Sequence, residues 1–356
     1  MDKKRNVITM GGAFVAFVMG SGFASGQEIM QFFSAFGLLR SITAGAVAML
    51  VFVWIATTVI VDGRGIVQDS SCGIYSYYCG NKIGALFEWL MPLIMFLFLI
   101  VMISGAGAAF YEYYGISEGI GRAIMCILAF FTVLLGLSGL VRIIGSLGII
   151  IIFVIVAISF VSIFKNIEGL VISDQVLEHI YVPRASFVDS WWISGLLYST
   201  FNMVTTLPFL AGLGKEANNK EDAFRAGAFG AFAYIAGAIL VNLALLSSIA
   251  QVYDKQIPFI PIASSLFPWI GAIFSVMLLA GIYTTAAPML WSICNLIGTE
   301  EKSLGYRLIA LFIIILAYIG SQLPFGILVG IIYPATGILG MLLLVCMLYK
   351  KYIKRK

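Results

Sequence analysis

The sequence predicts an all-α integral membrane protein whose ten membrane-spanning helices form two inverted five-helix repeats. Hydrophobic residues make up 61% of the 356 residues, charged residues make up 11%, and the mean hydropathy is +1.04, which far exceeds the needs of a soluble core. Apolar runs of about 20 residues, enough to cross roughly 30 Å of hydrocarbon, recur along the chain. Two of these runs contain helix-breaking residues at corresponding positions.

The predicted spans leave no room for a soluble domain. They lie at about residues 7–36, 41–62, 84–112, 119–137, 141–164, 191–213, 224–253, 268–297, 305–322 and 325–349. We therefore expect a first repeat at 1–164, an external connecting loop at 165–190 and a second repeat with a basic tail at 191–356. Apolar residues in that loop predict short amphipathic helices, which act either as a lid or as a tether over helix ends.

Charge sets the expected orientation. Basic residues occupy both ends of the chain, at 3–5 and at 350–356, and an even number of spans puts both ends on one side. The positive-inside rule makes that side cytoplasmic, so we expect a multi-pass protein of the cell membrane. The net charge of +4 follows the same bias, so the expected partners are the lipid bilayer and a small-molecule substrate, with no nucleic acid. Residues 1–26 imitate a signal peptide, but the apolar run continues to Phe36, which favours a span.

The first span contains a segment that an uninterrupted membrane helix would not choose. Three glycines and two serines lie within 20–26, where they lower helix propensity although the bilayer demands satisfied backbone groups. Bare backbone at membrane depth is tolerated only where it is buried in protein or lines a polar cavity. The segment therefore predicts a helix broken around a binding site. We expect amides of Gly26 and Gln27 to face a substrate carboxylate, and carbonyls of Gly20 and Phe23 to face a cation.

The sixth span carries a second predicted interruption. Hydroxyls, an amide and Pro208 lie at mid-membrane within 197–208, so we expect a break near 202–206. This segment follows the first by roughly 180 residues, and the same offset relates 103–108 to 281–286. Because five spans separate the two breaks, the second copy enters the membrane upside down, which gives the inverted repeat.

Three further features of the spans have competing interpretations. Adjacent Thr284 and Thr285 either supply oxygen ligands for sodium beside the first break or bond back to their own helix. Gly105 and Gly107 either line the site or permit a close helix crossing. Glu28, an acidic residue well inside a span, either carries a coupling proton, pairs with a substrate amine or is a solvated part of the outer vestibule.

These residues together resemble the amino acid, polyamine and organocation (APC) superfamily, whose members have the LeuT fold. The string from Gly20 to Glu28 is similar in particular to YkvI-type amino acid permeases, and the resemblance covers essentially the whole chain. It implies secondary transport by alternating access, in which spans one, two, six and seven rock against spans three, four, eight and nine.

The resemblance also implies a substrate site formed by two discontinuous helices, with a sodium site beside it. The expected substrate contacts are Ser21, Gly22, Phe23, Ala24, Ser25, Gly26, Gln27, Glu28, Gly105, Ser199, Phe201, Asn202 and Thr205. The expected sodium ligands are carbonyls of Gly20, Phe23 and Gly281 and hydroxyls of Thr284 and Thr285. Gln27 stands where sodium-coupled neurotransmitter-type members have Asn, which argues against a second sodium site. Glu28 is not part of the general superfamily pattern, so coupling by protons also stays open.

We therefore expect a symporter of an amino acid or a similar small zwitterion or amine, coupled to sodium or protons, with no cofactor beyond the coupling ion. A sensor or receptor subunit on the same fold is the main alternative. An intramembrane serine protease is another, because Gly136-Leu137-Ser138-Gly139 fits its GxSG form. That chemistry needs a base, and the only histidine, His179, lies in the external loop, so we expect no enzyme.

Overall fold

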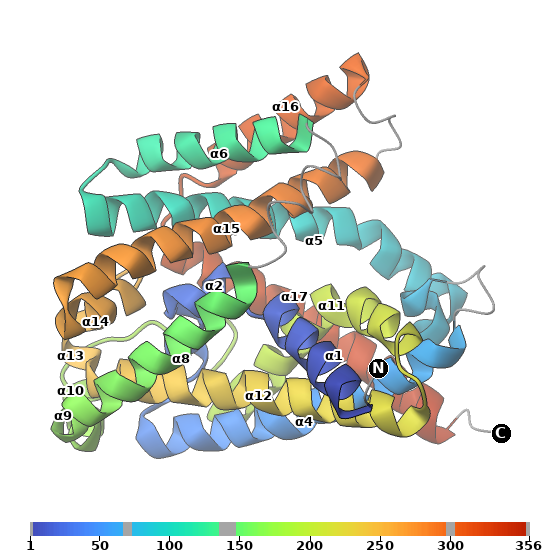
Figure 1. Ribbon diagram of the computed structural model, residues 1–356, viewed down its shortest axis with the longest axis horizontal. Helices are drawn as coiled ribbons and strands as arrows, with labels where there is room; N and C mark the ends of the chain where they lie inside the picture. Colours follow the sequence, from blue (N-terminus) through green and yellow to red (C-terminus); the bar gives the residue numbers. More distant parts are fainter. Residues whose placement is uncertain (1–2, 67–72, 135–146, 297–302, 354–356) are drawn as a thin grey trace.

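The computed structural model describes residues 3–66, 73–134, 147–296 and 303–353, and within these ranges it is helical and contains no β-strand. The long helices run side by side (Figure 1). Within the described ranges, six helices are long and apolar enough to cross a membrane, namely α4, α5, α11, α12, α15 and α17, and shorter apolar helices accompany them. α1 begins and α17 ends at the same end of the bundle (Figure 1).

The helices fall into two halves along the chain. The first half comprises α1 (Lys3–Val18), α2 (Ser21–Ser25), α3 (Gln27–Phe32), the 3₁₀ turn η1 (Ser34–Phe36), α4 (Leu38–Ile66), α5 (Ile74–Tyr114), α6 (Glu118–Leu134) and α8 (Leu147–Lys165). The second half comprises α11 (Trp191–Lys215), α12 (Lys220–Ser247), α13 (Ile249–Val252), α14 (Phe259–Leu266), α15 (Pro268–Leu296), α16 (Leu304–Gly320), α17 (Phe325–Leu348) and the π-helical turn η2 (Tyr349–Ile353).

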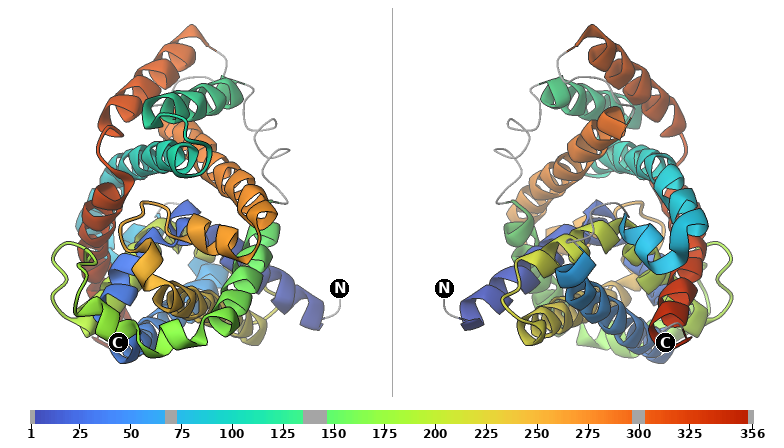
Figure 2. Two further views of the ribbon diagram at one scale, coloured as in Figure 1. Left: turned by 90° about the vertical axis from the view of Figure 1, so that its left-hand side faces the viewer. Right: turned by 90° about the vertical axis from the view of Figure 1, so that its right-hand side faces the viewer.

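In space the helices form two groups. α1, α4, α11 and α12 pack together, whereas α5, α6, α15 and α16 form a second group (Figures 1 and 2). α17 contacts both α11 and α5, and α8 contacts both α12 and α15, so these two helices connect the groups. The short helices α2 and α3 lie between the groups, because α2 packs against α15 and α5 while α3 packs against α11, α12 and α17.

Each predicted span contains at least one helix, with two differences at the ends and one additional helix. α5 begins at Ile74 rather than near 84, but it is kinked at Gly80, which leaves helical geometry (φ 73°, ψ 171°), so a short helical segment precedes the span. The seventh span ends at Ser247, whose successor Ser248 leaves helical geometry (φ −120°, ψ 19°) before α13. α14 was not predicted.

The prediction of a break near 202–206 is wrong, because α11 runs without interruption from Trp191 to Lys215. Pro208 cannot donate to the carbonyl of Val204, but the Tyr75 hydroxyl of α5 donates to that carbonyl instead (2.8 Å). The two threonines of this segment bond within their own helix. The Thr206 hydroxyl, for example, donates to the Asn202 carbonyl (2.7 Å). Within the described residues the sixth span is therefore the continuous helix α11.

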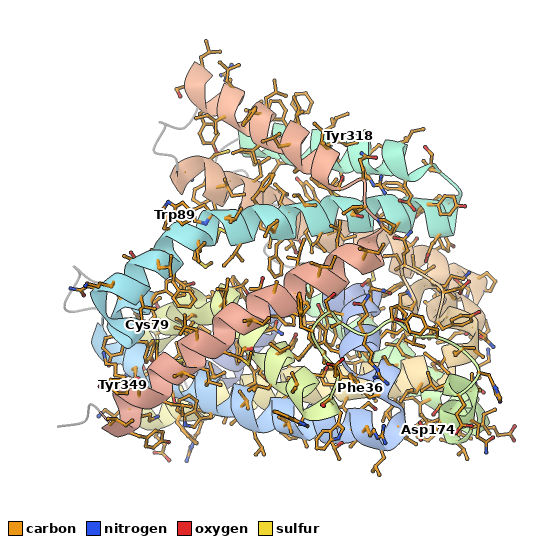
Figure 3. The ribbon with its side chains drawn as sticks, turned by 180° about the vertical axis from the view of Figure 1, so that it is seen from behind. Phe36, Cys79, Trp89, Asp174, Tyr318 and Tyr349 are labelled. Carbon is orange, nitrogen blue, oxygen red and sulfur yellow. The ribbon has the colours of Figure 1, made fainter. Side chains whose placement is uncertain are left out.

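The connecting loop contains the two short helices that the sequence predicts, α9 (Ile167–Val171) and α10 (Ser173–Leu177). Asp174 Oδ1 accepts a hydrogen bond from the Leu38 amide at the start of α4 (2.7 Å). Farther along, the Ser186 amide donates to the Gly330 carbonyl of α17 (2.7 Å). Figure 3 shows Asp174 close to Phe36, at the end of the bundle away from Tyr349 and Cys79. These contacts agree with the second of the two predicted roles of the loop, a tether over helix ends.

Candidate functional site

The first span is broken twice, just after α1 and again between α2 and α3, which confirms the predicted interruption. Gly20 is extended (φ −79°, ψ −177°), and Gly26 adopts the left-handed conformation (φ 81°) that glycine reaches without steric cost. The Gly26 amide donates to the Phe23 carbonyl (3.1 Å), and the Ser25 hydroxyl donates to the Gly22 carbonyl (2.8 Å). Local hydrogen bonds therefore hold the break in a defined shape.

Glu28 lies in the first turn of α3 and is only 4% exposed. Its Oε1 accepts a hydrogen bond from the Tyr198 hydroxyl of α11 (3.1 Å). Its Oε2 lies over Gly22, where an added Cβ would come within 2.6 Å of the Tyr333 hydroxyl oxygen and closer still to the carboxyl. Among the described residues no lysine, arginine or histidine forms an ion pair with Glu28. The prediction of a solvated vestibule residue is wrong for this conformation, and the roles of proton carrier and amine partner both fit.

A chain of hydrogen bonds continues from Glu28 into α11 and α12. The hydroxyl oxygens of Tyr198 and Tyr234 are 2.7 Å apart, and the Tyr234 hydroxyl lies 3.3 Å from Asn202 Oδ1, to which it can donate. Asn202 Nδ2 donates to the backbone carbonyl of Tyr198, one turn earlier in α11 (2.8 Å). These four residues, Glu28, Tyr198, Tyr234 and Asn202, are called the Glu28 network below.

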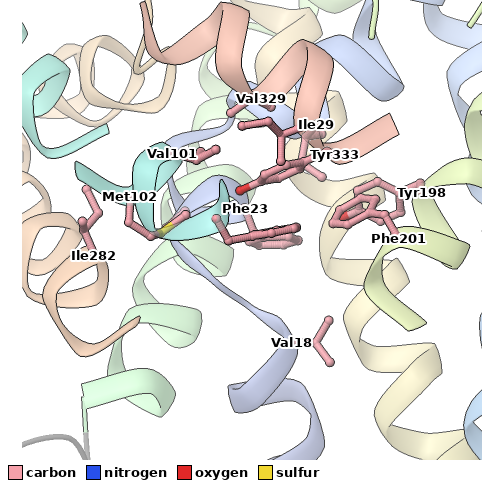
Figure 4. Close-up of a cluster of buried hydrophobic side chains, with 14 of the residues drawn as sticks. Val18, Phe23, Ile29, Val101, Met102, Tyr198, Phe201, Ile282, Val329 and Tyr333 are labelled. Atoms are coloured by element: carbon pink, nitrogen blue, oxygen red, sulfur yellow. The ribbon is translucent and has the colours of Figure 1, made fainter. Parts of the chain in front are cut away.

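Aromatic rings surround the Glu28 network. The Phe201 ring lies 4.9 Å from the Tyr333 ring and 5.3 Å from the Tyr198 ring, measured between centroids. The Phe23 ring lies 5.6 Å from that of Tyr234. Figure 4 shows Phe23 and Tyr333 near one another, with Tyr198 and Phe201 side by side. Such an apolar surrounding strengthens electrostatic interactions inside it and makes an unpaired polar group costly.

The structure brings only some of the expected substrate contacts to this place. Gly22, Phe23, Glu28, Phe201 and Asn202 touch the Glu28 network or belong to it, while Ser25 and Gly26 shape the break. Ser21 begins α2, and Ala24 is buried within it.

Three other expected contacts lie elsewhere. The Ser199 hydroxyl donates to the Ala48 carbonyl of α4 (3.0 Å). The Phe325 ring packs on Gly105, where an added Cβ would lie 2.9 Å from it. The Thr205 hydroxyl donates to the Asn202 carbonyl of its own helix (3.1 Å). Gly105 is therefore a close helix-crossing position, the simpler of its two predicted roles.

The backbone amides expected to face a substrate carboxylate already have acceptors. The Gly26 amide bonds to the Phe23 carbonyl, and the Gln27 amide donates to the Ser25 hydroxyl oxygen (3.2 Å). In this conformation a ligand would have to replace those local bonds.

A cavity of about 460 Å³ lies beside α3, on the side of the connecting loop. Its lining includes Gln27, Gln31, Arg184, Lys255, Gly326 and Gly330. No residue of the Glu28 network is among those that line this cavity.

The expected sodium ligands are divided between α2 and α15, which pack against each other. The hydroxyls of Thr284 and Thr285 both donate to the Gly281 carbonyl, at 2.9 and 3.0 Å, so they bond back to their own helix. This arrangement also gathers three oxygen atoms at one point of α15. The carbonyls of Gly20 and Phe23 accept from the Ala24 and Gly26 amides (both 3.1 Å), and a carbonyl oxygen has a second lone pair.

The sequence argument missed three tyrosines that build the site, Tyr198, Tyr234 and Tyr333. Tyrosine in membrane proteins concentrates at the interfaces, where its hydroxyl reaches water. All three lie well inside predicted spans and are at most 2% exposed. A tyrosine in the middle of a span needs a buried polar partner for its hydroxyl. The mid-span positions of these three tyrosines could therefore have indicated a buried polar site.

The GxSG motif at 136–139 lies outside the described residues. Within the described ranges, no group of three or more His, Cys, Asp or Glu residues is placed to hold a metal ion.

Similar proteins place the chain among membrane proteins. It is 25% identical over 353 residues to the uncharacterized membrane protein YkvI of Bacillus subtilis (strain 168), covering 96% of this chain and 95% of that protein. It is 23% identical over 341 residues to the uncharacterized protein YyaD of the same strain, covering 93% of each. No family model matches the chain.

Among solved structures, a substrate-bound, outward-open Na⁺-coupled sialic acid symporter matches 100% of this chain and 88% of its own, with a TM-score of 0.50 and 14% identity. At that identity the likeness concerns the fold. The chain is thus a multi-pass membrane protein whose described residues are helical and contain no strand, and its fold is like that of a solved transporter.

Proposed function

We propose that this chain is a secondary active transporter that moves an amino acid or a similar small zwitterion or amine by alternating access. The observation that carries the proposal is the broken first span, which holds the buried carboxyl of Glu28 between two packed groups of helices. In alternating access one group of helices rocks against another around a site built from broken helices. The fold shared with a sodium-coupled symporter supports the same assignment.

The proposed architecture has ten crossings in two inverted repeats, 1–164 and 191–356, joined by 165–190, with both termini cytoplasmic in the cell membrane. The common end at which α1 begins and α17 ends supports it (Figure 1). The moving group is α1, α4, α11 and α12, and the static group is α5, α6, α15 and α16. The observed packing of these same helices favours that division. The continuous α11 means that the second repeat contributes side chains rather than bare backbone.

Glu28 is the proposed determinant of what the protein binds. Burying an ionised carboxylate without a positive partner is costly. Glu28 is therefore proposed either to pair with a substrate ammonium group or to bind a proton. Rings such as those of Phe201 and Tyr333 also attract an ammonium group through their faces. We propose that the polar parts of the substrate contact Asn202 and the backbone of 22–26. The cavity beside Gln27 is the proposed entrance.

Sodium is the first proposed coupling ion and protons are the second. The sodium ligands would be the carbonyls of Gly20, Phe23 and Gly281 and the hydroxyls of Thr284 and Thr285. The packing of α2 against α15 and the shared Gly281 acceptor support this set.

Counterflow tests transport directly, without any imposed ion gradient. Proteoliposomes loaded with one unlabelled amino acid or monoamine should accumulate the labelled compound from outside when it is the substrate. A compound that stabilises the purified protein against heat yet shows no counterflow would instead identify a sensor on the same fold. A panel of amino acids and amines that neither binds nor exchanges would overturn the proposal.

A further inference from the structure

The Glu28 network contains three oxygen-to-oxygen contacts in a row. Glu28 Oε1 lies 3.1 Å from the Tyr198 hydroxyl, that hydroxyl lies 2.7 Å from the Tyr234 hydroxyl, and Tyr234 lies 3.3 Å from Asn202 Oδ1. Each contact is stabilising only if one hydrogen lies between its two oxygen atoms. The number of hydrogen atoms on these four side chains that can lie between the oxygen atoms therefore decides whether all three hydrogen bonds form.

The side-chain amide of Asn202 fixes which atom accepts at the far end of this row of hydrogen bonds. Its Nδ2 donates to the Tyr198 carbonyl (2.8 Å), so Oδ1 faces Tyr234 and can only accept. The reversed amide would set Oδ1 against that carbonyl and place two acceptors in contact. Asn202 thus adds no hydrogen to the row.

With Glu28 ionised, the row has two hydrogens for three contacts. Tyr198 donates to the carboxylate, and Tyr234 donates either to Tyr198 or to Asn202, which leaves one contact without a hydrogen. With Glu28 protonated, the carboxyl donates to Tyr198, Tyr198 to Tyr234 and Tyr234 to Asn202. One added proton completes the row and reverses the direction of its first hydrogen bond.

We infer that Glu28 takes up one proton in each transport cycle, and that Tyr198, Tyr234 and Asn202 form a relay that stabilises the protonated state in this conformation. This inference rests on the proposed transport function and concerns the proton, the second of its two proposed coupling ions. The proton comes from water, forms an O–H bond on Glu28, and leaves to water on the other side after the helices have moved. The relay joins α3 to α11 and α12, so loss of the proton weakens the contact between the broken span and its neighbours.

The surroundings of Glu28 within the described residues contain no competing charge. Tyr198 of α11, Tyr234 of α12 and Tyr333 of α17 are the titratable groups that face it. The neighbouring helix α2, Ser21–Ser25, has no titratable side chain, and the α3 residue beside Glu28 in the sequence is the neutral Gln27.

Infrared difference spectroscopy on purified protein reports the proton without requiring transport. The carbonyl stretch of a neutral carboxyl should appear on acidification, and its Glu28 component should be absent from Glu28→Gln. Tyr234→Phe leaves a single contact, which the Tyr198 hydrogen already satisfies when Glu28 is ionised. That variant should therefore bind the proton about tenfold more weakly than the unaltered protein.

Tyr198→Phe removes hydrogen bonds from both protonation states. The ionised state loses one bond to the charged carboxylate, and the protonated state loses two neutral bonds of the completed row. Because a bond to a charged group is worth more than a neutral one, these losses oppose each other, and the change in proton affinity should be smaller than in Tyr234→Phe. Tyr318→Phe is the matched control, because its hydroxyl contacts the Gly119 carbonyl (3.5 Å) away from the network. It should leave proton binding unchanged.

A larger loss of proton affinity in Tyr234→Phe than in Tyr198→Phe supports the relay, because general loosening of the site would weaken proton binding most in the variant whose side chain contacts Glu28 directly. Equal proton affinity in Tyr234→Phe and the unaltered protein, or a full carboxyl signal in Glu28→Gln, would overturn it. If the spectroscopic shifts appear but no compound shows counterflow, the proposed transport function fails while the proton site stands. If counterflow occurs without the shifts, the relay fails alone.

Discussion

Pro208 removes a hydrogen bond from the middle of α11, and Tyr75 replaces it. The Tyr75 hydroxyl donates to the Val204 carbonyl at 2.8 Å, and Val204 is 0% exposed. Tyr75→Phe would leave that carbonyl buried without a donor, at a cost of about 1–3 kcal/mol in the free energy of unfolding. The loss should be measurable by equilibrium unfolding in mixed detergent micelles.

A double-mutant cycle separates this effect from a general packing defect. Pro208→Ala restores the amide that bonds the Val204 carbonyl, so Tyr75→Phe should cost less than about 1 kcal/mol in that background. The resulting coupling energy should be about 1–2 kcal/mol. Tyr111→Phe serves as control, because Tyr111 is 56% exposed. An equal cost of Tyr75→Phe with and without Pro208 would refute the reasoning.

Three further predictions address the break, the ion ligands and the loop. Gly22→Ala should abolish counterflow, because its Cβ would lie 2.6 Å from the Tyr333 hydroxyl oxygen; unchanged counterflow would contradict the packing. Thr284→Ala combined with Thr285→Ala should remove thermal stabilisation by sodium over potassium, and stabilisation that persists would reject the ion ligands. Asp174→Ala should lower the unfolding free energy by about 0.5–2 kcal/mol through the lost cap on α4, as a denaturant titration would reveal.

The first break was predictable because its cause is local. Glycines and serines between Gly20 and Gly26 disfavour helix through their own backbone freedom, and the left-handed Gly26 is a property of that residue. The positions of the apolar helices were predictable for a similar reason, since apolar length decides them.

The continuous α11 was not predictable, because Pro208 is compensated by Tyr75 from a different span, 129 positions from Val204. The same limit applies to the Glu28 network. Glu28 stood out in the sequence, but its tyrosine partners come from α11 and α12, and only their packing brings the three hydroxyl and carboxyl groups together.

Ion-driven uptake tests the central claim, a transport site centred on Glu28, most directly. Once counterflow has identified a substrate, proteoliposomes holding the unaltered protein should concentrate it under an inward proton or sodium gradient. Glu28→Gln vesicles with the same amount of folded protein should show no gradient-driven accumulation. Accumulation by Glu28→Gln equal to that of the unaltered protein would contradict the account.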